Sequence, residues 1–515
     1  MLPMNERVKM SNKLKNTQRN IFFGFLNKVV TMLFPFAVRS IIIVKLGMEY
    51  VGLNSLFSSI LQVLSLAELG FGSAIVFSMY KPIATNDLAE IGALLNLYRK
   101  TYHIIGGIIL CVGMLLVPFL GHLISGGYPA NINIQILYLI YLFNTVSSYF
   151  LYAYKQSLLL AYQRVDVDSN IATIVNIVMY VIQILALVFT SNYYCYIVWL
   201  PISTIAINLW RNKRISRMFP DIQCAGNVSI EVKKDIFKRV TGLMLTRICQ
   251  VCRNSFDSII ISAFLGLTLL GKYQNYYYVM NTIIGFLGIV TTAVVAGIGN
   301  DVVTKSTEEN YNRCKVFMSG YITLAAWCTV CLLCLYQPFM RIWVSENNMF
   351  PFELVILMCL YFYFLKAGDI VAVYKDATGI YWEDRARPIV ESVANLIMNV
   401  AFVKMWGVYG VVVSTIVSIL FINIPWSTHV LFKTYFKISE KEYYLKLSKY
   451  FLQMCITGGI ALFIINRIYF YDDIFSFLVQ GFVCALLTFV LLLMFNYKDK
   501  EFRRFAALIK NMMVH

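Results

Sequence analysis

Charged residues are scarce in this chain of 515 residues: Asp, Glu, Lys and Arg together make up only 14%. Soluble domains contain about 25% charged and about 45–50% apolar residues, whereas 59% of the residues here are apolar. This composition excludes an ordinary soluble domain and indicates that most of the chain lies in lipid.

The sequence also lacks a catalytic or metal-binding motif. Its four histidines are scattered, with no HExxH pattern. The longest expected outer connections, near 121–134 and 337–351, contain no acid–base constellation beyond Arg341 and Glu346. A membrane-embedded polymerase, ligase or glycosyltransferase would carry its catalytic groups in such loops, so we expect no enzyme.

Cysteine is present but not paired in any recognisable way. The twelve cysteines lie mostly inside apolar runs and have no histidine partners at metal-ligand spacing. We interpret them as small core residues and expect no disulfide, no metal and no cofactor.

The apolar residues form long continuous runs. A membrane span needs about 20 apolar residues, and runs that do not alternate exclude a barrel in favour of helices. We therefore predict an all-α polytopic membrane protein with about fourteen spans, near residues 20–46, 53–80, 101–120, 135–154, 171–190, 193–210, 240–265, 273–299, 316–336, 352–374, 389–405, 410–428, 451–466 and 475–495.

Most of the 44 basic residues fall in segments on one side of these spans. The positive-inside rule then predicts that both termini are cytoplasmic. The net charge of +17 is explained by this topology and by attraction to anionic lipids, so no nucleic-acid partner is expected. No small-residue cleavage site follows the basic N-terminal segment, so we do not predict a removable signal peptide.

Part of the chain is repeated after about 219 residues. SIII followed by Leu46-Gly47 and Gly52 recurs as SIII followed by Leu265-Gly266 and Gly271. Tyr154-Lys155 matches Tyr374-Lys375 at an offset of 220, and NIVM at Asn176 matches NLIM at Asn395 at an offset of 219. We interpret this as a tandem duplication that produces two pseudo-symmetric lobes of six helices, with two extra C-terminal helices.

The predicted organisation follows from these spans. It comprises a basic tail (1–19), an N-lobe (20–210), an amphipathic cytoplasmic connector (211–239), a C-lobe (240–428), a cytoplasmic link (429–450), two appended spans (451–495) and a second basic tail (496–515).

Several charged side chains lie inside the spans, where they are costly and commonly functional. Lys28 and Arg39 are three helical turns apart with Pro35 between them. Glu68 lies near the middle of the second span, next to Gly70. Snorkelling to the membrane surface explains Lys28 equally well and is the alternative for Arg39, and a structural hydrogen bond is the alternative for Glu68.

The seventh span is the most polar, with Arg247, Arg253, Asn254 and Asp257. Arg253 and Asp257 have the spacing of an in-helix pair, and two arginines with one such partner suggest an anion site. An ion-pair network that joins helices is the alternative.

Three further polar patterns occur in the second half. Glu391, Asn395 and Asn399 form a stripe that could line a cavity, and Lys366 with Asp369 is expected to be a structural pair. The loop 383–388, EDRARP, is expected to be a solvated cytoplasmic turn.

Two six-helix lobes suggest alternating access around a site near the membrane midplane. A cavity with Arg39, Arg247 and Arg253 suits diphosphate oxygens, because guanidinium groups bind them in a forked geometry. We therefore expect a substrate with an anionic head and a lipid tail. Glu68 or Asp257 could bind a proton or a sodium ion for coupling, and the membrane potential could drive transport instead.

The segments RNIFFGFLNKVV, LGMEYVGLNSLFSSILQVLSLAELGFGSAIVFSMYKPIA and LLNLYRKTYHIIG resemble the bacterial polysaccharide-biosynthesis flippases of the Wzx (O-antigen or capsule) type. These belong to the multidrug/oligosaccharidyl-lipid/polysaccharide exporter superfamily. The resemblance implies an inner-membrane flippase for undecaprenyl-diphosphate-linked oligosaccharide, with membrane lipids, a polysaccharide polymerase and chain-length proteins as partners. A lipid II flippase is the main alternative, and a drug or cation antiporter of the same superfamily is a weaker one.

Overall fold

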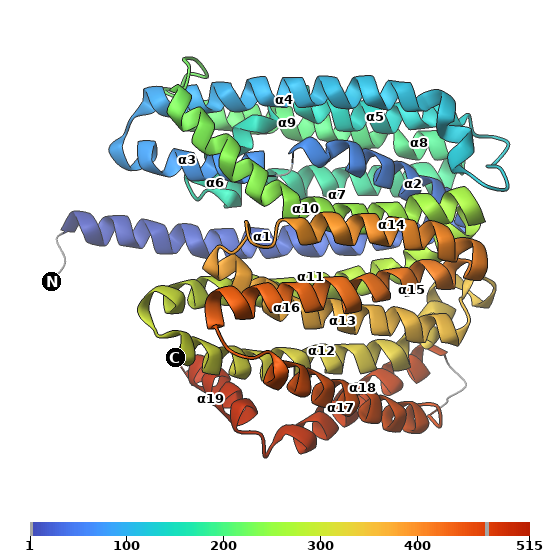
Figure 1. The fold of residues 1–515 in the computed structure, drawn as a ribbon. Helices are drawn as coiled ribbons and strands as arrows, with labels where there is room; N and C mark the ends of the chain where they lie inside the picture. The colour runs from blue at the N-terminus through green and yellow to red at the C-terminus, as the bar shows by residue number, and fades with distance from the viewer. Residues whose placement is uncertain (1–3, 69, 469–472, 515) are drawn as a thin grey trace. The chain divides into compact units, whose positions relative to one another are not determined.

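The computed structural model describes residues 4–68, 70–468 and 473–514, and some side chains within its helices, including that of Arg247, lie outside the description. Within those ranges every regular element is a helix, as the sequence predicts (Figure 1). The chain forms two compact units, one ending at Gly271 and one beginning at Lys272. This boundary lies about one helix later in the chain than residue 240, where the C-lobe was predicted to begin. The limits of the two lobes stay a prediction.

The first unit is built from α1 to α10 and three short 3-10 helices. Its elements are α1 (Met4–Lys45), α2 (Met48–Leu64), η1 (Ser65–Glu68), α3 (Phe71–Thr85), α4 (Leu88–Leu116), η2 (Val117–Leu123), α5 (Ile134–Phe150), η3 (Ala153–Lys155), α6 (Gln156–Ala161), α7 (Val165–Thr190), α8 (Tyr193–Ile197), α9 (Trp199–Met218) and α10 (Ile230–Leu265). Figure 1 shows α1 as a long helix, and it packs along α7.

The second unit begins inside α11, which spans the boundary. Its elements are α11 (Leu267–Thr304), α12 (Thr307–Val344), η4 (Glu346–Asn348), α13 (Phe352–Thr378), α14 (Ala386–Trp406), α15 (Val408–Ser418), the π-helical turns η5 (Ile419–Asn423) and η6 (Phe432–Phe436) on either side of α16 (Ile424–Leu431), α17 (Lys441–Ile465), α18 (Asp473–Asn496) and α19 (Lys500–Val514).

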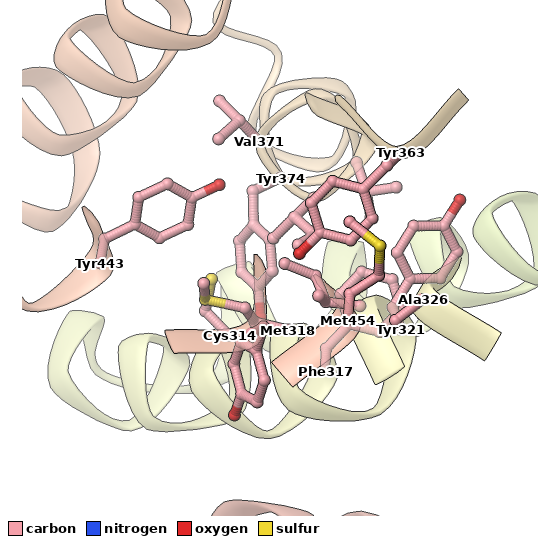
Figure 2. Packing of buried hydrophobic residues seen from close by; sticks show 14 of the residues in the cluster. Cys314, Phe317, Met318, Tyr321, Ala326, Tyr363, Val371, Tyr374, Tyr443 and Met454 are labelled. Atoms are coloured by element: carbon pink, nitrogen blue, oxygen red, sulfur yellow. The ribbon is translucent and has the colours of Figure 1, made fainter. Parts of the chain in front are cut away.

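Helix α12 is the centre of the second unit, where it contacts α13, α17, α18 and α19. Aromatic side chains pack with aliphatic and sulfur-containing ones in this core, and Figure 2 shows Tyr363, Tyr374 and Tyr443 among them. The hydroxyl of Tyr321 donates to Asp369, which also pairs with Lys366 at 2.7 Å. The predicted Lys366–Asp369 pair is confirmed.

The membrane-protein class is confirmed as well. Among the described residues, eleven helices are long and apolar enough to cross a membrane, or twelve if the bent pair Ile134–Phe150 and Ala153–Ala161 is one span. Two expected spans do not meet this criterion. Span 53–80 is interrupted between α2 and α3, and span 240–265 belongs to α10 and carries three charged residues, Arg247, Arg253 and Asp257.

The repeated LG motif has the same backbone conformation in both copies. Gly47 joins α1 to α2 with φ 111° and ψ 174°, and Gly266 joins α10 to α11 with φ 88° and ψ 174°. Side chains strongly disfavour this region, so glycine at both positions has a structural reason. The repeat thus corresponds to one structural unit that occurs twice.

Candidate functional site

The second span is broken at the position of its one acidic side chain. α2 ends at Leu64, the short helix η1 ends at Glu68, and α3 begins at Phe71 after Gly70, whose φ is +98°. Non-helical backbone at membrane depth occurs where protein or a water-filled cavity satisfies its polar groups. The break therefore marks a candidate site at Glu68, which the sequence analysis placed near the middle of the second span.

Two tyrosines hold the carboxylate of Glu68. The hydroxyl of Tyr102 on α4 donates to Oε1, and the hydroxyl of Tyr149 on α5 donates to Oε2 at 2.5 Å. Tyr98 lies one turn before Tyr102 and donates to its hydroxyl at 2.9 Å. Each carboxylate oxygen of Glu68 thus accepts a hydrogen bond from a neutral hydroxyl group.

A cationic group lies on the other side of the same cavity. Arg211 of α9 is only 8% exposed, and its Nε donates to Oδ1 of Asp168 at 2.6 Å while Nη1 donates to Asn208 at 2.9 Å. The second oxygen of Asp168 accepts from Gln156 at 2.7 Å. Asp168 therefore offsets the charge of Arg211 and fixes the direction of its guanidinium group.

The cavity between these groups has a volume of about 280 Å³. Its lining comes from η1, α4, α5, η3, α6 and α9 and consists of Glu68, Tyr102, Ser148, Ala153, Gln156, Thr204, Ile207, Asn208 and Arg211. A carboxylate with hydroxyl and amide oxygens around it is suited to a proton or a hard monovalent cation. The lining also includes the guanidinium group of Arg211, which is suited to an anion.

Three solved structures have a similar arrangement of helices. The lipid II flippase MurJ in an inward closed conformation matches with a TM-score of 0.67 and 18% identity, over 93% of this chain and 98% of its own. An inward-facing multidrug-resistance MATE family transporter of the MOP superfamily matches with a TM-score of 0.61 and 14% identity, over 78% and 96% of the two chains. An outward-facing structure of a multidrug-resistance MATE family transporter of the MOP superfamily matches with a TM-score of 0.54 and 13% identity, over 82% of this chain and 97% of its own.

This chain has the same fold as these three structures. At these identities the likeness concerns the fold alone. No protein-family model matches the sequence, and no curated protein matches it. The three solved structures are transporters, which agrees with the absence of a catalytic motif noted in the sequence.

The predicted cationic residues whose side chains the structure describes, Arg39, Arg253 and Lys28, do not line the Glu68 cavity. Arg39 is half-buried in α1. Lys28 is exposed. The side chain of Arg247 lies outside the described residues.

The other predicted site residues of α10 are buried or partly buried. Arg253 is 8% and Asp257 is 2% exposed, and Asn254 is partly buried. Between them, Ser255 donates to Gln62 of α2 at 3.2 Å, which places this part of α10 against α2. Their assignment to a diphosphate site remains a prediction.

Glu391 and Asn395 are buried in the second unit. Asn423 donates to Glu391 at 2.7 Å, and Asn395 donates to Thr415 at 3.3 Å. Asn399 donates to Asn395 at 3.2 Å. The stripe therefore joins α14 to the segment from α15 to η5, and a cavity role for it remains a prediction.

The expectation of a solvated turn at 383–388 is wrong for two of its four charged residues. Asp384 is 1% and Arg387 is 8% exposed. Lys375 forms an ion pair with Asp384, and Arg387 bridges Asp384 at 2.9 Å and Glu391 at 2.6 Å. The charges are buried because they neutralise each other, which sequence order alone does not reveal.

Sequence reasoning also missed Tyr102, Tyr149, Asp168 and Arg211. Nothing in their local sequence distinguishes the tyrosines from those of an interfacial belt, and Arg211 looked like the start of a basic cytoplasmic segment. Among the described residues, no group of three or more His, Cys, Asp or Glu could hold a metal ion.

Proposed function

We propose that this protein is a flippase that moves an undecaprenyl-diphosphate-linked oligosaccharide from the cytoplasmic to the outer leaflet of a bacterial inner membrane by alternating access. The observation that carries the proposal is the fold, which is that of a lipid II flippase over nearly the whole chain. A protein of this class carries no catalytic group, and the proposal includes no enzymatic step.

The charge of the spans favours an anionic head group. Arg253 is buried in α10 and Arg39 is half-buried in α1. Guanidinium groups bind phosphate oxygens in pairs, whereas an organic cation would require a predominantly acidic site. This argues against the drug or cation antiporter.

We assign Glu68 to coupling by a proton or a sodium ion. Its carboxylate lies at a helix break, faces a polar cavity and is held by two neutral hydroxyl groups. Each charge that crosses a membrane potential of 100 mV gains about 2.3 kcal/mol, so one coupled cation per cycle supplies a useful driving force.

A lipid II flippase is the second candidate. The MurJ fold favours it, and its substrate presents the same lipid-linked diphosphate to the protein. The polysaccharide assignment rests instead on the three N-terminal segments quoted above, and it implies a polymerase and chain-length proteins as partners in the same membrane.

Complementation of flippase-deficient strains distinguishes the polysaccharide flippase from the lipid II flippase. The chain would be expressed in a strain that lacks its polysaccharide flippase and, separately, in a strain depleted of its lipid II flippase. Restored surface glycan in the first strain supports the proposal, and rescued growth only in the second supports the alternative. Rescue of neither, with the chain present in the membrane, would contradict a flippase function.

A further inference from the structure

A second polar hollow lies in the first unit, where α1 enters the unit, α7 begins and α9 ends. Its volume is about 210 Å³, and it is lined by Arg19, Phe23, Arg164, Asp166, Val167, Asn170, Ile171, Trp210 and Arg214. It shares no lining residue with the Glu68 cavity. The proposed transport cycle does not use it.

Positive charge is in excess in this hollow. The carboxylate of Asp166 is 1% exposed and accepts two hydrogen bonds from Arg164, at 2.9 and 3.2 Å. Arg19 reaches the same carboxylate at 3.4 Å. Asp166 thus holds two guanidinium groups at the rim and neutralises only one of them.

Arg214 contributes a third guanidinium group from α9. It is exposed, and no carboxylate within the described part of the chain pairs with it. Trp210 and Arg214 also line a separate, neighbouring hollow of about 460 Å³, together with Leu209, Lys213 and Arg217. Trp210 and Arg214 thus line both hollows, and each hollow has further basic side chains in its lining.

The lining of the hollow also includes apolar side chains. Phe23, Val167 and Ile171 line the first hollow. Leu209 and Trp210 are 48% and 43% exposed, and Phe22 on α1 is 63% exposed. Tryptophan beside exposed aliphatic and aromatic groups is typical of the membrane interface. The hollow thus combines a phosphate-binding rim with a surface suited to acyl chains.

We propose that this hollow binds the phosphate head group of an anionic phospholipid. The surplus of guanidinium groups suits a phosphate diester, and the apolar part of the lining favours a lipid over a soluble anion. The residues lie on the side of the membrane that the positive-inside rule assigns to the cytoplasm. The proposal does not depend on which substrate the protein transports.

Native mass spectrometry of the purified full chain in detergent tests it. Cardiolipin and phosphatidylglycerol would be titrated against the zwitterionic phosphatidylethanolamine, with pyrophosphate and a short-chain polyprenyl diphosphate as competitors. The variant is Arg214→Ala, because Arg214 holds no other described side chain in place. The control is Arg385→Ala, which removes another exposed arginine, in the second unit.

We expect the anionic phospholipids to bind the wild type and the control alike, and to bind Arg214→Ala about tenfold more weakly, as for the loss of one charge-assisted hydrogen bond. Equal binding of phosphatidylethanolamine, or unchanged binding by Arg214→Ala, would overturn the proposal. Displacement of cardiolipin by pyrophosphate alone would overturn it too, since the site would then bind a soluble anion. Displacement only by the polyprenyl diphosphate would reassign the hollow to the lipid-linked substrate and thereby refute the phospholipid assignment.

Discussion

Gly52 lies so close to Leu267 that a Cβ atom at position 52 would overlap the backbone carbonyl oxygen of Leu267. The same relationship occurs once more with the partners exchanged, because a Cβ atom on Gly271 would overlap the carbonyl oxygen of Met48. Gly271 follows Gly52, and Leu267 follows Met48, by 219 residues in each case. The two contacts are therefore equivalent under the internal repeat, as in a self-complementary two-fold contact.

This reciprocal contact predicts that alanine is not tolerated at either glycine. Gly52→Ala and Gly271→Ala should each lower the free energy of unfolding by about 1–3 kcal/mol, because the backbones of α2 and α11 must separate to admit a methyl group. Thermal unfolding of the purified variants measures the effect.

Gly107→Ala is the matched control, since nothing lies within 4 Å of the added Cβ in α4. Replacing a mid-helix glycine by alanine stabilises a helix by about 0.5–1 kcal/mol, so this variant should melt no lower than the wild type. Equal melting temperatures for all three variants would show that the close contact is not maintained.

The buried charge cluster of the second unit gives a second prediction. Asp384→Ala should lower the free energy of unfolding by about 3–5 kcal/mol, because Lys375 and Arg387 would remain buried without their shared carboxylate. The neighbouring Glu383 is exposed, so Glu383→Ala should change stability by less than about 0.5 kcal/mol. A similar loss for both variants in thermal unfolding would contradict the buried cluster.

Asp499 gives a third prediction, on pH. Burial alone would raise the pKa of its carboxyl group, but hydrogen bonds with Glu501 and Lys449 outweigh this and hold the pKa well below its usual range. A depressed native pKa means that the stabilisation is fully present above the ordinary value of about 3.9 and is lost as the pH falls through the native pKa. Attachment of α19 should therefore resist mild acid and weaken only below about pH 4.

Two substitutions separate the roles of Asp499. Asp499→Asn keeps an acceptor for the backbone N–H of Glu501, whereas Asp499→Ala removes both this cap and the ion pair with Lys449 at 2.7 Å. Loss of the cap costs about 0.5–2 kcal/mol. Hydrogen exchange in α19 should rise more in Asp499→Ala than in Asp499→Asn, and equal exchange would assign the whole effect to the ion pair.

What could be predicted from the sequence depended on local spacing. Apolar runs predicted the helices, and the three-residue spacing of Lys366 and Asp369 predicted their pair. The burial of Asp384 depends on Lys375, which lies across a turn, and the orientation of Arg211 depends on Asp168, on another helix. Tertiary partners of this kind leave no mark in hydropathy or periodicity.

The helix break at Glu68 shows the same limit at the candidate site. The surrounding residues are as apolar as a continuous span, and Gly70 is compatible with either a close helix contact or a break. Tyr102 and Tyr149 lie 34 and 81 residues away and stabilise the carboxylate where the helix ends. Their contribution follows from packing of α4 and α5 around η1.

The tyrosines supply the sharpest test of the site. Glu68→Gln removes the charge while it keeps the shape, so coupled transport in proteoliposomes should fall by at least tenfold if Glu68 carries the coupling cation. Tyr149→Phe removes one donor to the carboxylate at a cost of about 1.5–3 kcal/mol for a bond to a charged group, and transport should fall to a smaller extent.

Tyr138→Phe is the matched control for Tyr149→Phe. Tyr138 is fully buried in α5, and its hydroxyl has no hydrogen-bond partner among the described residues. Removing that hydroxyl should leave transport unchanged and stability unchanged or improved, because an unsatisfied buried polar group is lost. If Tyr138→Phe and Tyr149→Phe reduced transport equally, the effect would reflect packing in α5, and the hydrogen bond to Glu68 would have no special part in coupling.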